Sequence, residues 1–379
     1  MNVLNGAESA AYAMKQINPD VVAAYPITPQ TEIMMKFAEF VANKEVGTKM
    51  VLVESEHSAM SAVVGASAGG VRAMTASSSA GLAYMFEVLG IASGLRLPIV
   101  MNIANRALSG PINIHCDHSD SMNCKDSGWI QLYSEDSQEV YDNTIIGVKL
   151  AEKLHLPLMV MQDGFITSHC LQNIELIKDK TVSDFVGAYN PETNLLNINK
   201  PITIGPLQLP DYLFETKRQQ AEAMSLVEKE FNSVCREYEK ITGRKYGVIE
   251  EYHSRDAKQV IVVLNSAAGT VKTVVNELRK NGKKVGLVKV KLFRPFPYEA
   301  VNKALSGAES VVVLDRSESF GANPPLYSEI SNSLHNTSVK LSSVVFGLGG
   351  RDLFETDIKT IFENMISNKK QDKYVGVRE

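Results

Sequence analysis

The sequence is poor in cysteine, and the few cysteines present are not closely spaced. The four among 379 residues include no CxxC pair: Cys116, Cys124, Cys170 and Cys235. This spacing excludes the usual iron–sulfur clusters and structural zinc sites. His115 and His118 lie beside the first of them and could, with the first two cysteines, supply ligands from one loop. Because their spacing matches no common zinc pattern, we expect no metal on this chain and leave the role of these residues open.

The sequence also lacks an excess of basic residues and any long apolar run. Its 39 Lys and Arg residues face 43 Asp and Glu residues, for a net charge of −4. Neither nucleic acid nor an anionic membrane is therefore expected as a partner. No apolar stretch is long enough to cross a bilayer, and the N-terminus has no basic segment followed by an apolar core. We expect a cytoplasmic protein that recognises its partners through specific sites.

Phosphate-binding loops are missing as well. GASAGG at 65–70 lies late in an expected helix, and GLGG at 347–350 does not open a helix with a suitably placed acidic residue. No P-loop occurs. A non-catalytic nucleotide-binding or regulatory α/β protein, the alternative from a different class, would therefore lack its usual phosphate loop.

What is present is an alternation of apolar runs and helical patterns in the first half of the chain. Asn5 and Glu8 form a capping-box pattern, helices are expected at 82–92 and 137–154, and the polar stretch 117–136 is expected to be irregular. Buried strands are expected at 21–25, 50–53, 73–76, 98–104 and 156–162. This order predicts an α/β fold with a parallel sheet covered by helices on both faces.

The second half predicts an extended excursion at 181–211, a long helix from Asp211 to Gly243, and a further α/β unit. The apolar segments of that unit are at 261–264, 284–290, 311–315 and 342–350. A chain of 379 residues with 44% hydrophobic residues can bury two cores. We expect domains at 1–242 and 256–379.

Two glutamates lie at the turn after the strand expected at 50–53. Glu54 and Glu56 precede a helix expected at 58–68, and such strand-to-helix turns are where open α/β sheets bind ligands. A glutamate is also favoured at the positive end of a helix dipole. From position alone, either residue could be catalytic or an end-of-helix charge.

Thr28 and Arg106 follow two other expected strands. Thr28 could cap a helix that begins at Pro29, or it could present its hydroxyl to a cleft. Arg106 could be a solvated charge, or it could bind a carboxylate or phosphate through two parallel hydrogen bonds. The residues alone leave both alternatives open.

Longer motifs resemble the alpha subunit of pyruvate:ferredoxin oxidoreductase. They are AYPITPQTE at 24–32, VESEHSAMSAVVGASAGG at 53–70, TASSSAGLAYM at 75–85, NRALSGPINIHCDHSDS at 105–121, DGFITSH at 163–169, RPFP at 294–297, LDRSESFGA at 314–322 and GLGGRD at 347–352. The resemblance spans nearly the whole chain. It implies a thiamine diphosphate enzyme with a transketolase-like pyrimidine-binding domain at 1–242 and a second α/β domain, similar to the C-terminal domain of transketolase, at 256–379.

The resemblance also implies roles for individual residues. Glu56 matches the catalytic glutamate that hydrogen-bonds a ring nitrogen of the aminopyrimidine, and Glu54 is then an end-of-helix charge. Thr28 matches a contact to the substrate. Arg106 matches the arginine that binds the substrate carboxylate.

Part of the implied cofactor site is absent from this chain. Thiamine enzymes hold magnesium and diphosphate with a GDG motif followed by Asn, which does not occur here. The resemblance therefore implies a beta subunit that carries this site and an iron–sulfur cluster, with gamma and delta subunits that carry further clusters. Pro26 and Ile27 are expected to complete the cofactor contacts of this chain.

The implied reaction converts pyruvate and coenzyme A to acetyl-CoA and carbon dioxide while ferredoxin is reduced, and it is reversible. NRALSGPIN at 105–113 resembles the pyruvate branch and, more weakly, the branched-chain 2-oxoacid branch. Members that act on 2-oxoglutarate have a GGPSTG-like stretch there. The sequence leaves the physiological direction and the subunit stoichiometry open.

Overall fold

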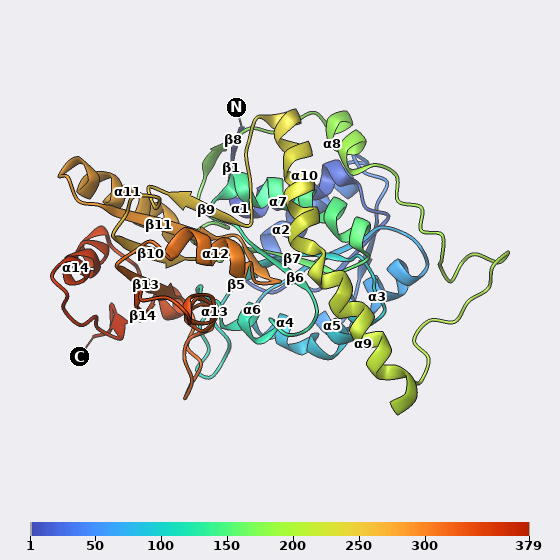
Figure 1. Ribbon diagram of the computed structural model, residues 1–379. Coiled ribbons are helices and arrows are strands. Elements are labelled where there is room, and N and C mark those ends of the chain that lie inside the picture. Colours follow the sequence, from blue (N-terminus) through green and yellow to red (C-terminus); the bar gives the residue numbers. More distant parts are fainter. Residues whose placement is uncertain (1, 379) are drawn as a thin grey trace.

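The computed structural model describes residues 2–378, which form two α/β units, each built on its own sheet (Figure 1). The first sheet has the strand order β12-β6-β7-β5-β4-β2-β3. Its strands are β2 (Val21–Ala24), β3 (Lys49–Leu52), β4 (Ala73–Ser77), β5 (Val100–Asn105), β6 (Ile130–Tyr133), β7 (Leu158–Asp163) and β12 (Leu292–Arg294). All neighbours are parallel except β12, which pairs antiparallel with β6. The predicted α/β fold with a parallel sheet is confirmed.

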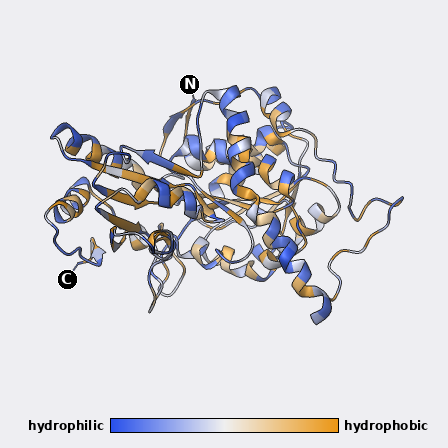
Figure 2. Cartoon of the chain, viewed as in Figure 1, coloured by the Kyte–Doolittle hydropathy of each residue, from blue (hydrophilic) through white to orange (hydrophobic). Residues whose placement is uncertain are grey.

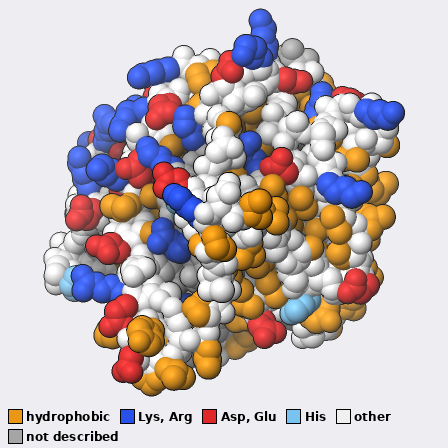
Figure 3. Space-filling model, turned by 90° about the vertical axis from the view of Figure 1, so that its right-hand side faces the viewer, with side chains coloured by type: hydrophobic (Ala, Val, Ile, Leu, Met, Phe, Trp, Pro, Cys, Tyr) orange, Lys and Arg blue, Asp and Glu red, His pale blue; other side chains and the backbone are white. Residues whose placement is uncertain are grey.

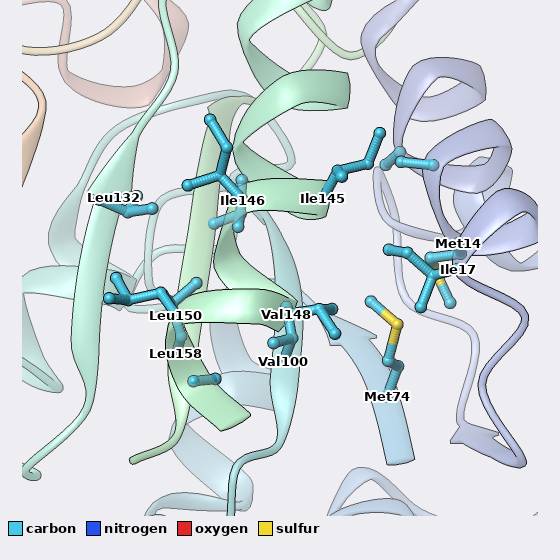
Figure 4. Packing of buried hydrophobic residues seen from close by; sticks show 14 of the residues in the cluster. Met14, Ile17, Met74, Val100, Leu132, Ile145, Ile146, Val148, Leu150 and Leu158 are labelled. Atoms are coloured by element: carbon cyan, nitrogen blue, oxygen red, sulfur yellow. The ribbon is translucent and has the colours of Figure 1, made fainter. Parts of the chain in front are cut away.

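Helices cover this sheet and bury an apolar core against it. They are α1 (Gly6–Ile17), α2 (Thr31–Ala42), α3 (Glu56–Ala68), α4 (Ser79–Tyr84), α5 (Phe86–Gly94) and α7 (Ser137–Leu154). Figure 4 shows Met14 and Ile17 of α1 facing Met74 of β4, and Leu150 of α7 beside Leu158 of β7. Burial of these side chains supplies the main driving force for this packing.

Two helix starts agree with the sequence patterns. The Asn5 side chain accepts a hydrogen bond from the Glu8 N–H at 2.8 Å, and the Glu8 carboxylate accepts one from the Asn5 N–H at 3.0 Å. The capping box is therefore confirmed. α7 has the predicted bounds, with Asp136 as its N-cap.

Of the two alternatives left open for Thr28, the cap of a helix that begins at Pro29 is wrong. The Thr28–Pro29 bond is cis, and α2 begins at Thr31 with Gln30 at the N-cap position. The Thr31 N–H donates to the Ile27 carbonyl at 3.1 Å. A backbone turn thus satisfies the start of α2, and the Thr28 side chain is not needed as a cap.

The prediction of an irregular stretch at 117–136 is also wrong. It contains α6 (Ser119–Asn123) and the buried strand β6. Gln131 interrupts the apolar pattern of β6, yet it is buried and its side-chain nitrogen donates to the Ser121 carbonyl at 2.9 Å. A polar residue with an internal hydrogen-bond partner therefore hides this strand from periodicity.

Two expected helices are each divided. The helix at 82–92 breaks at Met85 into α4 and α5, and the long helix breaks at Leu226 into α9 (Pro210–Ser225) and α10 (Val227–Thr242). The excursion is shorter than predicted, because α8 (Asp179–Val186) occupies its start. Figure 1 shows the remaining segment, between α8 and α9, extending away from the body.

The second unit has a six-stranded sheet with the order β15-β14-β13-β10-β11-β9. Its elements are β9 (Ile249–Tyr252), β10 (Gln259–Val263), α11 (Ala267–Lys280), β11 (Val285–Val290), α12 (Tyr298–Leu305), β13 (Ser310–Asp315), α13 (Pro325–Leu334), β14 (Lys340–Phe346), α14 (Glu355–Ile366) and β15 (Tyr374–Val375). Figure 2 shows hydrophobic residues along the central strands of both units. β1 (Asn2–Leu4) and β8 (Gln172–Ile174) form a small separate ladder. Within residues 2–378, no helix combines the length and apolar character that a membrane span needs.

Candidate active site

The carboxyl ends of the parallel strands bring the predicted site residues to one edge of the first sheet. Pro26, Ile27 and Thr28 follow β2. Glu56 follows β3, and Arg106 follows β5. Because β3, β2, β4 and β5 are consecutive parallel neighbours, the loops after them lie side by side. Ligands commonly bind at this edge of open α/β sheets.

Glu56 is the first residue of α3, and its side chain packs against Gly81 of α4. Only 8% of Glu56 is exposed. A Cβ atom at residue 81 would lie 2.6 Å from Glu56 Oε1 and 2.8 Å from its Cγ. The absence of a side chain at Gly81 therefore makes room for the carboxyl group. Ser55 fixes the start of the helix, since its hydroxyl accepts a hydrogen bond from the Ser58 N–H at 3.1 Å.

Glu54 lies two residues earlier and is exposed to solvent. Its carboxylate accepts a hydrogen bond from the Ser58 hydroxyl, and this bond lowers the pKa of Glu54. A charged, exposed carboxylate beside the first turn of a helix is typical of an end-of-helix charge. The fold thus encloses one of the two neighbouring carboxyl groups and leaves the other in water.

Arg106 joins two loops at the same edge. Its Nη1 donates to the Thr28 carbonyl at 2.9 Å, and its Nε donates to the Asn113 carbonyl at 3.0 Å. Nη2 forms no hydrogen bond within residues 2–378. The guanidinium group is therefore held in place by backbone carbonyls, with Nη2 as the nitrogen that remains for a ligand.

Asp120 of α6 accepts four hydrogen bonds at this edge. Its Oδ2 accepts the backbone N–H groups of Ser79 at 2.9 Å and Arg106 at 3.0 Å. Its Oδ1 accepts the Asn105 side-chain nitrogen and the Ser121 N–H, both at 2.8 Å. Burial raises the pKa of Asp120 to about 6, although the four hydrogen bonds oppose this rise.

Cys116, His118 and Asp163 converge, with possible ligand atoms within 4.8 Å of one another. Arg316 of the second unit meets them, since its Nη1 lies 2.8 Å from Asp163 Oδ2, and His118 Nε2 lies 2.8 Å from Asp163 Oδ1. Burial raises the pKa of the Cys116 thiol well above its usual value. A thiol and a carboxylate already paired with arginine are poor metal ligands. This cluster is therefore best described as a buried ion pair between the two units.

His115 and Cys124 do not join that cluster. Cys124 is buried among apolar side chains, and burial raises its pKa to about 12. His115 is exposed, and its ring centroid lies 5.0 Å from that of Phe165. The four residues from one loop, whose role the sequence left open, therefore lie in different environments of the fold and do not form one site.

Sequence patterns did not mark Gly81 or Asp120. The stretch 77–81 has the composition of a small-residue turn, and nothing in it shows that α4 packs against Glu56. Asp120 lies in a stretch expected to be irregular. A buried acidic residue becomes visible only when its hydrogen-bond donors, from three separate segments, are placed around it.

Family models match most of the chain. Residues 12–236 match the family described as pyruvate flavodoxin/ferredoxin oxidoreductase, thiamine diP-bdg, that is, its thiamine diphosphate-binding domain. Residues 257–358 match pyruvate:ferredoxin oxidoreductase core domain II. The chain belongs to the pyruvate:ferredoxin oxidoreductase family. This membership confirms the enzyme prediction over the non-catalytic regulatory alternative.

Relatives in the pyruvate:ferredoxin oxidoreductase family match over their full length. The chain is 54% identical to pyruvate synthase subunit PorA of Thermotoga maritima, covering 99% of this chain and 98% of the relative. It is 46% identical to the PorA subunit of Methanocaldococcus jannaschii, covering 100% and 98%. It is 41% identical to ketoisovalerate oxidoreductase subunit VorA of Pyrococcus horikoshii, covering 98% and 96%. The predicted identification with the alpha subunit is confirmed, and such a subunit is part of a multi-subunit enzyme.

Solved structures confirm the transketolase-like α/β fold. A 2-oxoglutarate:ferredoxin oxidoreductase from Magnetococcus marinus matches with a TM-score of 0.75 and 21% identity, covering 96% of this chain. This chain spans 65% of the length of that chain. A split-gene transketolase matches with a TM-score of 0.57 and 12% identity, covering 97% of this chain and 99% of that chain. At these identities, the likeness concerns the fold alone.

Proposed function

We propose that this chain holds the aminopyrimidine ring of thiamine diphosphate with Glu56 and the carboxylate of pyruvate with Arg106. One observation carries the proposal: an enclosed carboxyl group after β3 and a held guanidinium group after β5 lie at the same carboxyl edge of one parallel sheet, with the loops after β2 and β4 between them. The 54% identity to pyruvate synthase subunit PorA supports pyruvate as the 2-oxoacid.

The surroundings of Glu56 fit a flat, partly apolar ring. Glu56 is enclosed, while Leu52 at the end of β3 and Tyr84 of α4, the helix whose Gly81 packs on Glu56, are 83% and 60% exposed, so the elements around the carboxyl group carry exposed apolar side chains. Pro26 and Ile27 would contact the ring from the loop after β2. Glu56 would hold a proton at its carboxyl oxygen and share it with a ring nitrogen, as a general acid–base group does. Thiamine diphosphate, when bound, supplies the electron sink for decarboxylation.

Arg106 and Thr28 would orient the substrate. A small 2-oxoacid offers one carboxylate as a handle, and Nη2 of Arg106 is the donor that the loops leave for it. Thr28 is exposed, so its hydroxyl can add a weaker, neutral donor. Because the loops already fix the guanidinium group, binding would cost little further side-chain entropy.

The remaining half of the site is proposed to lie on a beta subunit, since this chain lacks the GDG motif for magnesium and diphosphate. Exposed apolar side chains lie at the end of β3 and on α4 and α5, the helices that pack against α3: Leu52, Tyr84, Phe86 and Ile91. Figure 3 shows hydrophobic side chains gathered on the side of the molecule that carries α3 and α5. Such a patch is typical of an interaction surface. The beta subunit would also carry an iron–sulfur cluster, and gamma and delta subunits would pass electrons on to ferredoxin.

Reconstitution tests this function. The isolated chain should not reduce a viologen dye with pyruvate and coenzyme A, because it has neither the diphosphate site nor the electron acceptor. The complex with its partner subunits and thiamine diphosphate should do so. Turnover by the isolated chain would contradict the assignment.

A branched-chain 2-oxoacid is the second candidate substrate, and the 41% identity to ketoisovalerate oxidoreductase subunit VorA favours it. Parallel kinetics of the complex with pyruvate and 3-methyl-2-oxobutanoate decide between the two. We expect the higher kcat/KM with pyruvate. The opposite order would assign the chain to the branched-chain enzymes.

A further inference from the structure

We infer that Asp120 is a positioning residue. It fixes the proposed substrate-binding residue Arg106 relative to α4, the helix that packs against the proposed cofactor-binding residue Glu56. The inference rests on the function proposed for Arg106 and Glu56. Asp120 Oδ2 accepts the backbone N–H of Arg106, at the end of β5, and that of Ser79, at the start of α4. Gly81, which packs against Glu56, lies two residues after Ser79. One carboxylate oxygen therefore ties the proposed substrate site to the proposed cofactor site.

The chemistry of the four partners requires a carboxylate at this position. Both oxygens of Asp120 accept hydrogen bonds, and the groups that face them are all N–H donors. A carboxylate presents only acceptors, whereas an asparagine side chain presents one acceptor and an NH₂ group. Whichever way its amide is oriented, an asparagine at this position would turn its NH₂ group toward donors in place of one of the two oxygens. Asp120→Asn is therefore a near-isosteric change that replaces one of the two acceptor oxygens with a donor and removes the hydrogen bonds that this oxygen accepts.

The backbone conformation of Ser79 shows why the hydrogen bonds to Asp120 matter. Ser79 has φ of 45°, in the left-handed region that residues with a side chain seldom adopt. Besides its N–H bond to Asp120, its hydroxyl donates to the Ala107 carbonyl at 2.5 Å. Because Asp120 also binds the Arg106 N–H, both bonds connect Ser79 to the segment that follows β5. Residues held in this region persist where the surrounding structure over-determines them, and such positions cluster at functional sites.

Asp120→Asn in the assembled oxidoreductase tests the inference. We expect KM for pyruvate to rise roughly tenfold to a hundredfold, the effect of losing hydrogen bonds to a charged group, together with weaker thiamine diphosphate binding. Asp315→Asn is the matched control. Asp315 is a buried carboxylate that accepts the N–H groups of Leu326 at 2.8 Å and Tyr327 at 3.0 Å in the second unit. Its variant should lower the melting temperature but leave KM for pyruvate unchanged.

Arg106→Lys, measured in parallel, separates this inference from the proposed function. If Arg106→Lys raises KM and Asp120→Asn does not, the positioning role is wrong and the substrate site stands. If neither variant changes KM, the substrate site itself is misplaced and the inference falls with it. Should the Asp120→Asn complex fail to assemble, Asn105→Ala removes one donor and keeps the carboxylate. That variant should raise KM by a smaller factor, and an unchanged KM would overturn the inference.

Discussion

The carboxyl group of Glu56 packs so closely on Gly81 that a Cβ atom at residue 81 would lie 2.6 Å from Glu56 Oε1. Glu56 begins α3, and Gly81 belongs to α4, which follows β4. The contact joins two helices at the edge where the cofactor is proposed to bind. Any side chain introduced at residue 81 would therefore displace the proposed catalytic carboxyl group.

Gly81→Ala should therefore displace the Glu56 carboxyl group and lower the turnover of the assembled enzyme by roughly tenfold to a hundredfold, because acid–base catalysis depends on position. Gly65→Ala in α3 is the control, since an added Cβ there meets nothing within 4 Å. In a helix this control should stabilise the chain by about 0.5–1 kcal/mol. Steady-state rates and melting curves of both variants check the prediction, and equal turnover would contradict it.

Glu56→Gln should lower activity by roughly a hundredfold to ten-thousandfold, because the amide keeps the shape of the side chain but cannot share a proton. Glu54→Gln should have a much smaller effect, since Glu54 is exposed and faces Ser58. Both are measured as kcat in intact complexes. Equal losses would show that the enclosed carboxyl group is not the catalytic one.

Arg106→Lys should weaken pyruvate binding by roughly 1–3 kcal/mol, because lysine cannot keep the bonds to the Thr28 and Asn113 carbonyls and also meet the substrate. Thiamine diphosphate binding should be nearly unchanged. KM for pyruvate and a cofactor titration of the same complex measure the two effects. Loss of cofactor binding with an unaltered KM would place Arg106 in the cofactor site.

Thr28→Val should cost about 1 kcal/mol in pyruvate binding, the contribution of one neutral hydrogen bond. It should not destabilise α2, because that helix begins at Thr31 and its start is satisfied by the backbone. KM for pyruvate and the melting temperature separate these effects. A lower melting temperature with unchanged KM would mean that the hydroxyl acts in folding alone.

Asp163→Asn should destabilise the chain by roughly 3–5 kcal/mol at pH 7, because it leaves the buried Arg316 without its charged partner. Burial alone would raise the pKa of Asp163, but Arg316 and His118 hold it far below its usual range. A carboxyl pKa that is lower in the folded state stabilises the protein above the unfolded value of about 3.9, and this stabilisation is lost as the pH falls further.

The stability difference between wild type and Asp163→Asn should therefore shrink below about pH 4, as melting temperatures at several pH values can show. Glu309→Gln serves as the control. Glu309 pairs with Lys258 at 2.6 Å, but more than half of each side chain is exposed, so its removal should cost less than about 1 kcal/mol. A pH-independent difference for Asp163→Asn would mean that the carboxylate charge is not what stabilises the contact.

Apolar periodicity was sufficient to predict most strands of the first sheet and the full span of α7. It failed for β6, where Gln131 is buried with an internal partner, and for β12, which pairs with β6 from far along the chain. It also failed at Leu226 and Met85, where apolar stripes continue across a break between two helices. Local patterns report which residues are buried, but they do not report where the regular hydrogen bonding of a helix is interrupted.

The sequence by itself determined which polar side chains end the parallel strands, and so placed Glu56 and Arg106 at one edge of the sheet. Only the tertiary structure decided that Glu56 is enclosed while Glu54 is exposed. It also decided that Gly81 faces the enclosed carboxyl group and that Asp120 joins the start of α4 to the end of β5. The physical reason is that the burial and hydrogen bonding of a carboxylate depend on groups from several distant segments, whereas sequence periodicity describes one segment at a time.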